Sequence, residues 1–206
     1  GKRCLVASSS KSRVNKLASA IQSRHPALRI MTITAESQGE AERKFIDNPG
    51  TEFLNYDLIL ASPSLGTGVD ITFPGGEPVV DVVFGFCDAV PVTHFDFDQQ
   101  LSRVRNPKEV KVWISPQVAS FETNLDVVRH DLLTQSLYKN TLSHWDDKGA
   151  PVYDLTDPLI EMAALVRSQQ IASRNRIKEN FIAHKKAQGF TIIHIGRDGT
   201  PVREGV

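Results

Sequence analysis

The fold is decided by residues 57–71, which read DLILASPSLGTGVDI. Residues 57–61 form a short apolar run of the kind that becomes a buried strand. A loop of small residues follows, and it contains the Gly66-Thr67-Gly68 turn. Such a loop leaves backbone N–H groups accessible, so that a phosphate or a nucleotide can approach closely. The alternative is a tight structural turn capped by Asp70.

Four further apolar runs resemble this strand, and helical patterns separate them. The expected strands are residues 3–7, 29–34, 79–86 and 110–115. The helix after the first strand has one apolar face, formed by Val14, Leu17, Ala18 and Ile21. Polar helices are expected at residues 39–47 and 96–104. This alternation predicts an α/β fold, a doubly wound and mainly parallel sheet of five buried strands that binds ligands at their carboxyl ends.

After Pro116 the pattern changes to longer helices. One is expected to begin at Leu125, and another covers residues 159–188. A strand-like run at residues 190–195 and the turn sequence RDGT that follows it predict a closing hairpin. The sequence therefore predicts two domains. Residues 1–116 form the parallel α/β domain, and residues 117–206 form a helical appendage that ends in a short β-hairpin.

Composition narrows the possible functions. The 206 residues include 24 basic and 24 acidic side chains, so any affinity for nucleic acid depends on local patches. No apolar run reaches the ~20 residues that span a bilayer, and no signal peptide is present, which predicts a cytoplasmic protein. The histidines and cysteines lack paired ligand spacing, so we expect no metal site. The chain opens directly on a strand, which suggests a piece of a longer protein.

A second informative segment is residues 94–107, HFDFDQQLSRVRNP. On a helix, Gln99 shares a face with Arg103. Arg103 and Arg105 come at the end of this helix, just before a break. Paired guanidinium groups suit phosphate, because each donates two parallel hydrogen bonds. The alternative is a solvated basic face paired with acidic residues of the same helix.

The order of these segments resembles the C-terminal RecA-like domain of superfamily 2 helicases, over residues 2–116. SPSLGTGVD resembles motif V, QQLSRVR resembles motif VI, and the opening strand with its serines resembles motif IV. Two departures concern motif VI, written Q-x-x-G-R-x-x-R: Ser102 replaces the glycine, and Arg105 stands one place before the second arginine. A narrower resemblance is to the helicase part of cyanobacterial RepA-type plasmid replication proteins and to the herpesvirus-type origin-binding protein.

The resemblance implies roles for particular residues. Arg103 or Arg105 would be the arginine finger, with Gln99 as the first residue of motif VI. Gly68 and Asp70 would meet the nucleotide. Contacts to nucleic acid are implied for six residues: Ser8, Ser9, Lys11, Ser62, Ser64 and Thr67.

The chain has no G-x-x-x-x-G-K-[ST] motif and no carboxylate pair placed to hold Mg²⁺. The resemblance therefore implies that ATP and Mg²⁺ are bound mainly by an N-terminal RecA-like domain of the same polypeptide. This chain would be the second motor domain of an ATP-hydrolysing helicase or translocase in DNA replication, inactive as an isolated piece. Its expected partner is single-stranded DNA, and its location is nuclear if the source is a eukaryotic virus.

Two alternatives remain open. The chain is a non-catalytic RecA-like module that binds nucleic acid or protein, or it is a small-molecule enzyme with a nucleotide cofactor on the GTG loop. The second alternative lacks G-x-G-x-x-G with an acidic residue about 20 positions on. A Walker-type lysine upstream of Gly1 would favour the helicase over the first alternative.

Overall fold

The computed structural model describes residues 1–37, 39–65, 68–88, 90–134, 142–153, 158–196 and 201–202. The chain divides into two compact units, one made of Gly1–Pro116 with Ile177–Val206 and the other of Gln117–Arg176. One break falls at Pro116, and the segment after Arg176 groups with the sheet unit, whereas the sequence assigns all of residues 117–206 to the appendage.

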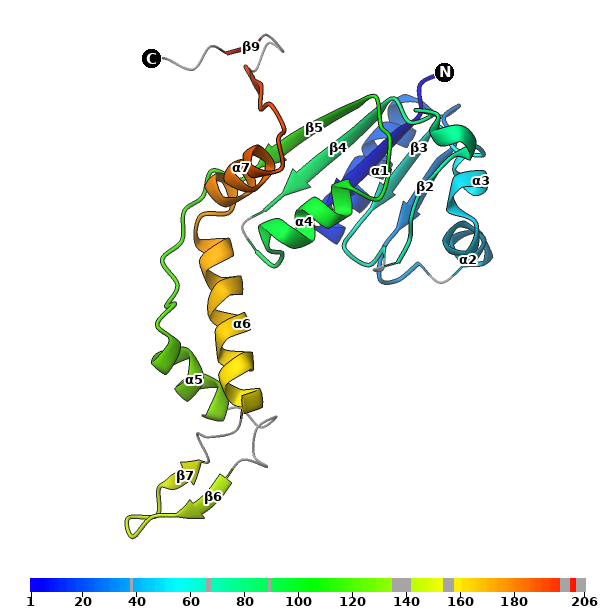
Figure 1. The fold of residues 1–206 in the computed structure, drawn as a ribbon. Coiled ribbons are helices and arrows are strands. Elements are labelled where there is room, and N and C mark those ends of the chain that lie inside the picture. The colour runs from blue at the N-terminus through cyan, green and yellow to red at the C-terminus, as the bar shows by residue number, and fades with distance from the viewer. Residues whose placement is uncertain are drawn as a thin grey trace. The chain divides into compact units, whose positions relative to one another are not determined.

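Five parallel strands form one sheet in the order β2-β3-β1-β4-β5 (Figure 1). Their bounds are Cys4–Ser8 for β1, Ile30–Ile33 for β2, Leu58–Ala61 for β3, Val82–Cys87 for β4 and Glu109–Ile114 for β5. β3 is buried at every position, as its apolar run predicts. The expectation of five buried strands is wrong for β5, which lies at the sheet edge with Val110 48% and Val112 43% exposed.

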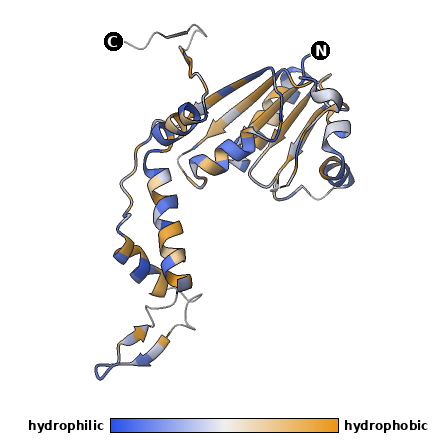
Figure 2. Cartoon of the chain, viewed as in Figure 1, coloured by the Kyte–Doolittle hydropathy of each residue, from blue (hydrophilic) through white to orange (hydrophobic). Residues whose placement is uncertain are grey.

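Helices cover both faces of the sheet. On one face, α1 (Lys11–Arg24) packs its predicted apolar stripe against side chains of β1, β3 and β4. The other face carries α2 (Glu40–Asp47), α3 (Pro49–Phe53), α4 (His94–Leu101) and α7 (Ile177–Ala187). The sheet strands are largely orange in Figure 2, which fits strands covered on both sides. The predicted doubly wound α/β fold is thereby confirmed.

The end of α4 differs from the expected helix at residues 96–104. Thr93 caps the helix by accepting a hydrogen bond from the Asp96 N–H, while the Asp96 carboxylate accepts one from the Thr93 N–H. This capping box starts the helix two residues earlier than expected. The helix ends at Leu101, because Val104 lies in a β-bridge with Ile71.

The short 3-10 helix η1 (Pro74–Gly76) follows Ile71.

In the second unit, α5 (Leu125–Thr134) packs against α6 (Pro158–Asn175) through Val128, Leu132 and Ala164. β6 (Leu142–Trp145) and β7 (Pro151–Tyr153) form an antiparallel pair. The single helix expected at residues 159–188 is wrong. It stops at Asn175, whose carbonyl accepts a hydrogen bond from the Ala119 N–H at 2.9 Å, and α7 then begins separately at Ile177.

Near the C-terminus, β8 (His194–Ile195) pairs with β9 (Pro201–Val202) in antiparallel fashion, as the predicted hairpin requires. The RDGT turn between these strands lies outside the described residues. Within the part of the chain that the structure describes, no helix combines the length and apolar composition needed to cross a membrane.

Candidate functional site

The loop after β3 and the segment after α4 lie side by side. Ile71 and Val104 form a parallel β-bridge, in which the Ile71 N–H donates to the Arg103 carbonyl at 2.8 Å. The Arg105 N–H in turn donates to the Ile71 carbonyl at 3.3 Å. Ile71 and Val104 are both buried, at 1% and 2% exposed. The bridge therefore brings together the two segments that the sequence singled out.

Beside this bridge, Asp70 and Arg105 form an ion pair. Arg105 Nε donates to Asp70 Oδ1 at 2.8 Å, and the two side chains are 45% (Asp70) and 60% (Arg105) exposed. The hydrogen bond to Asp70 raises the pKa of Arg105. Gly68, two residues earlier, is exposed and has a φ of +107°, a conformation that favours glycine. The pair is accessible, so an incoming anion can compete with Asp70 for the guanidinium.

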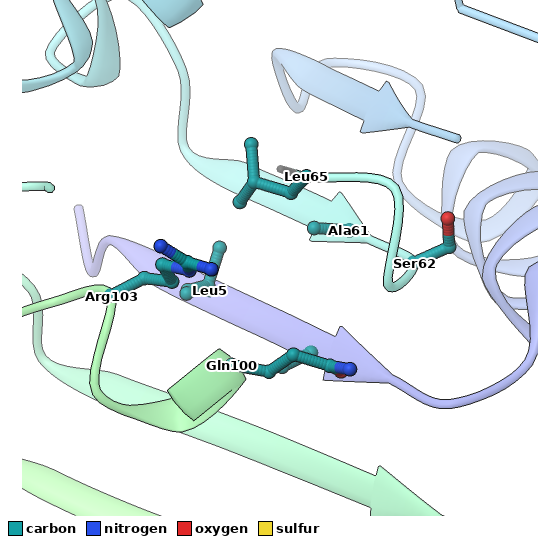
Figure 3. Close-up of a pocket in the computed structure, with 7 residues that line it drawn as sticks. Leu5, Ala61, Ser62, Leu65, Gln100 and Arg103 are labelled. Carbon is teal, nitrogen blue, oxygen red and sulfur yellow. The ribbon is translucent and has the colours of Figure 1, made fainter. Parts of the chain in front are cut away.

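Arg103 is turned toward the sheet. Its Nη1 donates to the Val69 carbonyl at 3.2 Å, and its side chain lines a cavity of about 10 Å³ (Figure 3). Burial lowers the pKa of Arg103, although the nearby Asp70 carboxylate opposes that effect. Its Nε is buried and has no hydrogen-bond partner among the described residues. Arg103 is thus half-buried, whereas Arg105 is exposed.

Gln99 and Gln100 lie in different environments on α4. Gln99 is exposed, whereas Gln100 is only 9% exposed and lines the same cavity as Arg103 and Ser62 (Figure 3). Gln100 Oε1 is buried without a partner in the described part of the protein. Sequence reasoning missed Gln100. The signal for it was its spacing, three residues after Phe97 and therefore on the buried face of α4.

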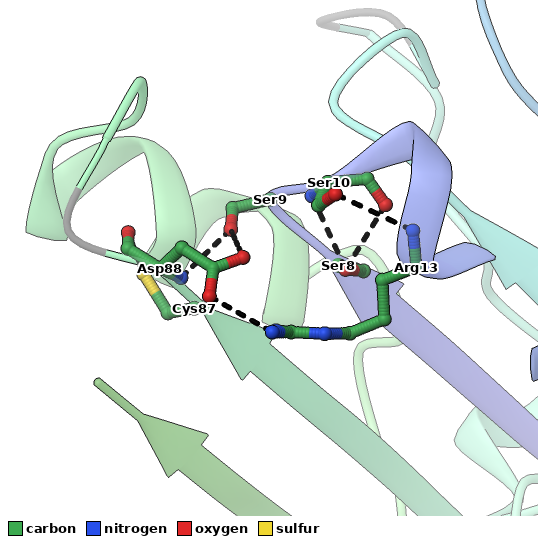
Figure 4. A network of polar contacts seen from close by, with 6 residues as sticks. All are labelled: Ser8, Ser9, Ser10, Arg13, Cys87 and Asp88. Carbon is green, nitrogen blue, oxygen red and sulfur yellow. Dashed lines mark hydrogen bonds and ion pairs between the residues drawn. The ribbon is translucent and has the colours of Figure 1, made fainter. Parts of the chain in front are cut away.

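Ser8 and Ser9, predicted to contact nucleic acid, are buried at 0% and 4% exposed. Ser9 Oγ accepts a hydrogen bond from the Asp88 N–H at 2.8 Å, and the Asp88 carboxylate pairs with Arg13 Nη2 at 2.8 Å (Figure 4). The Arg13 guanidinium also lies 5.0 Å from the centre of the Trp113 ring. These contacts tie the carboxyl ends of β1 and β4 together. Both serines are therefore enclosed within this network.

The other predicted nucleic-acid contacts divide between surface and interior. Ser62 is 3% exposed and hydrogen-bonds with the exposed Ser64. Lys11 is 40% exposed and forms an ion pair with Glu36. Thr67 lies outside the described residues. Lys11 and Ser64 are thus the accessible members of the predicted set within the described ranges.

The donor groups of the site suit phosphate oxygens better than a magnesium ion. The guanidinium groups of Arg103 and Arg105, two residues apart in the chain, can donate to phosphate oxygens. A magnesium ion prefers carboxylate oxygens, and in the described ranges no group of three or more His, Cys, Asp or Glu residues is placed to hold a metal. The donor set thus suits the phosphate oxygens of a ligand.

No protein-family model matches this chain, and no curated protein matches it either. Solved structures do match. Mss116p DEAD-box helicase domain 2, bound to an RNA duplex, is 11% identical with a TM-score of 0.43, over 56% of this chain and 43% of that one. The S. cerevisiae Dbp5 C-terminal domain, bound to Gle1 and IP6, is 14% identical with a TM-score of 0.39, over 55% and 60%.

The Pyrococcus furiosus Hef helicase domain is 16% identical with a TM-score of 0.35, and the match covers 55% of this chain and 22% of that one. The chain thus spans less than two thirds of the length of each of these three structures. Similarities at this level of identity and TM-score do not assign the chain to a family. The functional case rests on its own residues.

Proposed function

We propose that this chain is the second, arginine-bearing RecA-like motor domain of an ATP-dependent nucleic-acid helicase or translocase. The observation that carries the proposal is the Ile71–Val104 bridge. It joins the segment that resembles motif V to the segment that resembles motif VI. Because the bridge is formed by residues 33 positions apart, from 104 − 71, the site depends on the fold and not on one local motif.

In this proposal, Arg105 is the group that reaches the transferred phosphoryl. Asp70 holds its guanidinium at 2.8 Å, and a terminal phosphate would compete for the same donors. Arg103, anchored on the Val69 carbonyl, supplies a second positive charge. ATP and Mg²⁺, held mainly by an N-terminal RecA-like domain of the same polypeptide, supply the phosphoryl-transfer chemistry.

The accessible Lys11 and Ser64 are the proposed contacts to the nucleic-acid backbone, with Thr67 and Gly68 in the same loop as Ser64. Contacts of this kind go to phosphates and position the strand without reading its sequence. Single-stranded DNA, a role in DNA replication, and kinship with plasmid- or virus-type initiators are the finer parts of the proposal, and they rest on the resemblance of the motifs. On that basis the protein acts in the cytoplasm, or in the nucleus if its source is a eukaryotic virus.

The experiment is ATP hydrolysis by the full-length protein with Arg103→Ala and Arg105→Ala made singly. Loss of an arginine finger lowers turnover by roughly 10³-fold or more in well-studied NTPases. We expect a loss of that order in Arg105→Ala, with nucleotide binding largely retained. Lys111→Ala, on the edge strand β5, is the matched loss of one positive charge away from the site. Full turnover in both arginine variants would favour the non-catalytic binding module instead.

Nucleic-acid binding needs a separate measurement. Fluorescence anisotropy of a labelled single strand, titrated over a range of salt concentrations, gives the number of phosphate contacts from the slope. Lys11→Ala is expected to weaken binding for every sequence and to reduce that slope by about 1. An unchanged slope would remove Lys11 from the proposed path of the strand.

A further inference from the structure

Helix α7 packs directly on α4, the helix that precedes the candidate arginines. Ile177 and Phe181 of α7 are 0% and 3% exposed and belong to the main core of the sheet unit. The Phe181 ring lies 5.3 Å from the ring of Phe97 in α4. These contacts fix α7 to the sheet unit beside α4.

Asp98 of α4 is the polar centre of this contact. Its side chain is 12% exposed, and it accepts hydrogen bonds from Lys185 Nζ at 2.8 Å and from Gln188 Nε2 at 3.2 Å. His184 Nε2 lies 3.1 Å from the same carboxylate. Burial alone would raise the pKa of Asp98, but the donors from the C-terminal segment outweigh it and the pKa is lowered. The carboxylate therefore remains charged and paired.

The same residue leads directly to the candidate site. The Asp98 carbonyl accepts the Ser102 N–H at 3.0 Å, which closes the last turn of α4. Arg103 follows immediately, and its carbonyl is held by Ile71. The arginine segment is thus held on one side by the bridge to Ile71 and on the other by the main-chain carbonyl of Asp98, whose side chain is held by α7.

We infer that α7 braces the C-terminal end of α4, just before Arg103, with Asp98 as a positioning residue that Lys185 holds in place. The mechanical part of this inference concerns the fold alone, whereas the effect on ATP turnover rests on the proposed function. A buried carboxylate that loses its cation costs more than a surface pair, because the remaining charge is left without compensation. Weakening the Lys185 contact should therefore loosen the turn before Arg103.

Amide hydrogen exchange tests the mechanical part on this chain. Lys185→Gln removes the cation, Lys185→Arg keeps it, and Lys186→Gln is the matched control on the exposed neighbouring residue. We expect Lys185→Gln to speed exchange at the amides of Ser102 and Arg105 by about tenfold, while the β3 amides, which report global opening, change much less. Lys185→Arg and Lys186→Gln should behave like the parent protein.

The same variants in the full-length protein test the functional part. Lys185→Gln is expected to lower kcat for ATP hydrolysis several-fold with little change in KM, and Lys185→Arg is expected to restore it. Asp98→Asn should reproduce the Lys185→Gln effect. The inference is overturned if exchange at Ser102 and Arg105 rises only in step with β3, or if kcat is unchanged while Arg103→Ala or Arg105→Ala removes turnover. Full turnover in the arginine variants instead overturns the proposed function and leaves the exchange result to stand by itself.

Discussion

Asp70 and Arg105 lie 35 positions apart in the sequence and meet in an ion pair of 2.8 Å. The pair exists because the β-bridge between Ile71 and Val104 sets their backbones side by side. An exposed ion pair of this kind contributes little to stability, and under the proposed function its guanidinium is open to a phosphate. Its contribution to stability can be measured.

The first prediction is that the Asp70–Arg105 pair contributes little to stability. Both side chains are substantially exposed, at 45% and 60%, so water and salt screen their attraction. Asp70→Asn and Arg105→Gln are each expected to shift Tm by less than about 3 °C. Thermal unfolding of both single variants and the double variant checks this, and strong coupling between the two substitutions would show that the pair is structural instead.

The second prediction concerns Gly85 in the middle of β4, where α4 approaches the sheet. A Cβ at this position would lie 2.6 Å from Leu101 Cδ2 and 2.7 Å from Phe97 Cζ. Gly85→Ala is therefore expected to destabilise the protein by roughly 1–3 kcal/mol through overpacking. Urea denaturation measures the change.

A second substitution, Leu101→Ala, tests whether this clash is what destabilises Gly85→Ala. Leu101→Ala alone should cost about 2–5 kcal/mol, because it leaves a cavity in the core. In the double variant the removed Leu101 side chain makes room for the new methyl group. The two changes should therefore cost less together than the sum of their separate costs. Simple additivity would show that the clash is not what destabilises Gly85→Ala.

The strands could be predicted from sequence because each is marked by its own composition. β3, for instance, is apolar at every position, and such a run has few alternatives to a covered strand. The exposure of Val110 and Val112 could not be predicted in the same way. It follows from the place of β5 at the end of the sheet order, which composition does not encode.

The predicted helix bounds were wrong where they depend on capping or on contacts between residues far apart in the sequence. The break after Asn175 depends on a hydrogen bond from Ala119, 56 positions earlier by 175 − 119. Gln100 was missed because the buried face of α4 depends on how the helix packs on the sheet. The arginine segment was found from its residue types, whereas its bridge to Ile71 and its brace by α7 required the fold.

The third prediction is that Gln100 can be replaced by a hydrophobic side chain at little cost. Its Oε1 is buried without a protein partner in the described ranges, and an unsatisfied buried polar group carries a penalty of about 1–3 kcal/mol. Gln100→Met has a similar length and removes that group. The free energy of unfolding should stay the same or increase. A loss of more than about 1 kcal/mol would mean that Gln100 makes a favourable contact that offsets this penalty.

The last prediction concerns acid stability and the start of β3. Asp57 accepts hydrogen bonds from Arg29 Nη2 at 2.7 Å, from its Nε at 3.1 Å and from its backbone N–H at 3.0 Å. These contacts lower the pKa of Asp57 from 3.8 to about 2, with the Arg29 side chain as the largest cause. A carboxyl group whose pKa is lower in the folded state stabilises that state only when it is ionised. The contribution is therefore present above about pH 4 and is lost as the pH falls toward 2.

Asp57→Asn should accordingly have a lower Tm than the parent protein at pH 7, and the difference should narrow as the pH falls from 4 to 2. The effect should be modest, because Arg29 is 55% exposed and the ion pair is screened by solvent. Asp47→Asn, at an exposed position on α2, is the control and should follow the parent at every pH. A Tm difference between Asp57→Asn and the parent that stays constant down to pH 2 would show that the side chain acts by its shape and not by its charge.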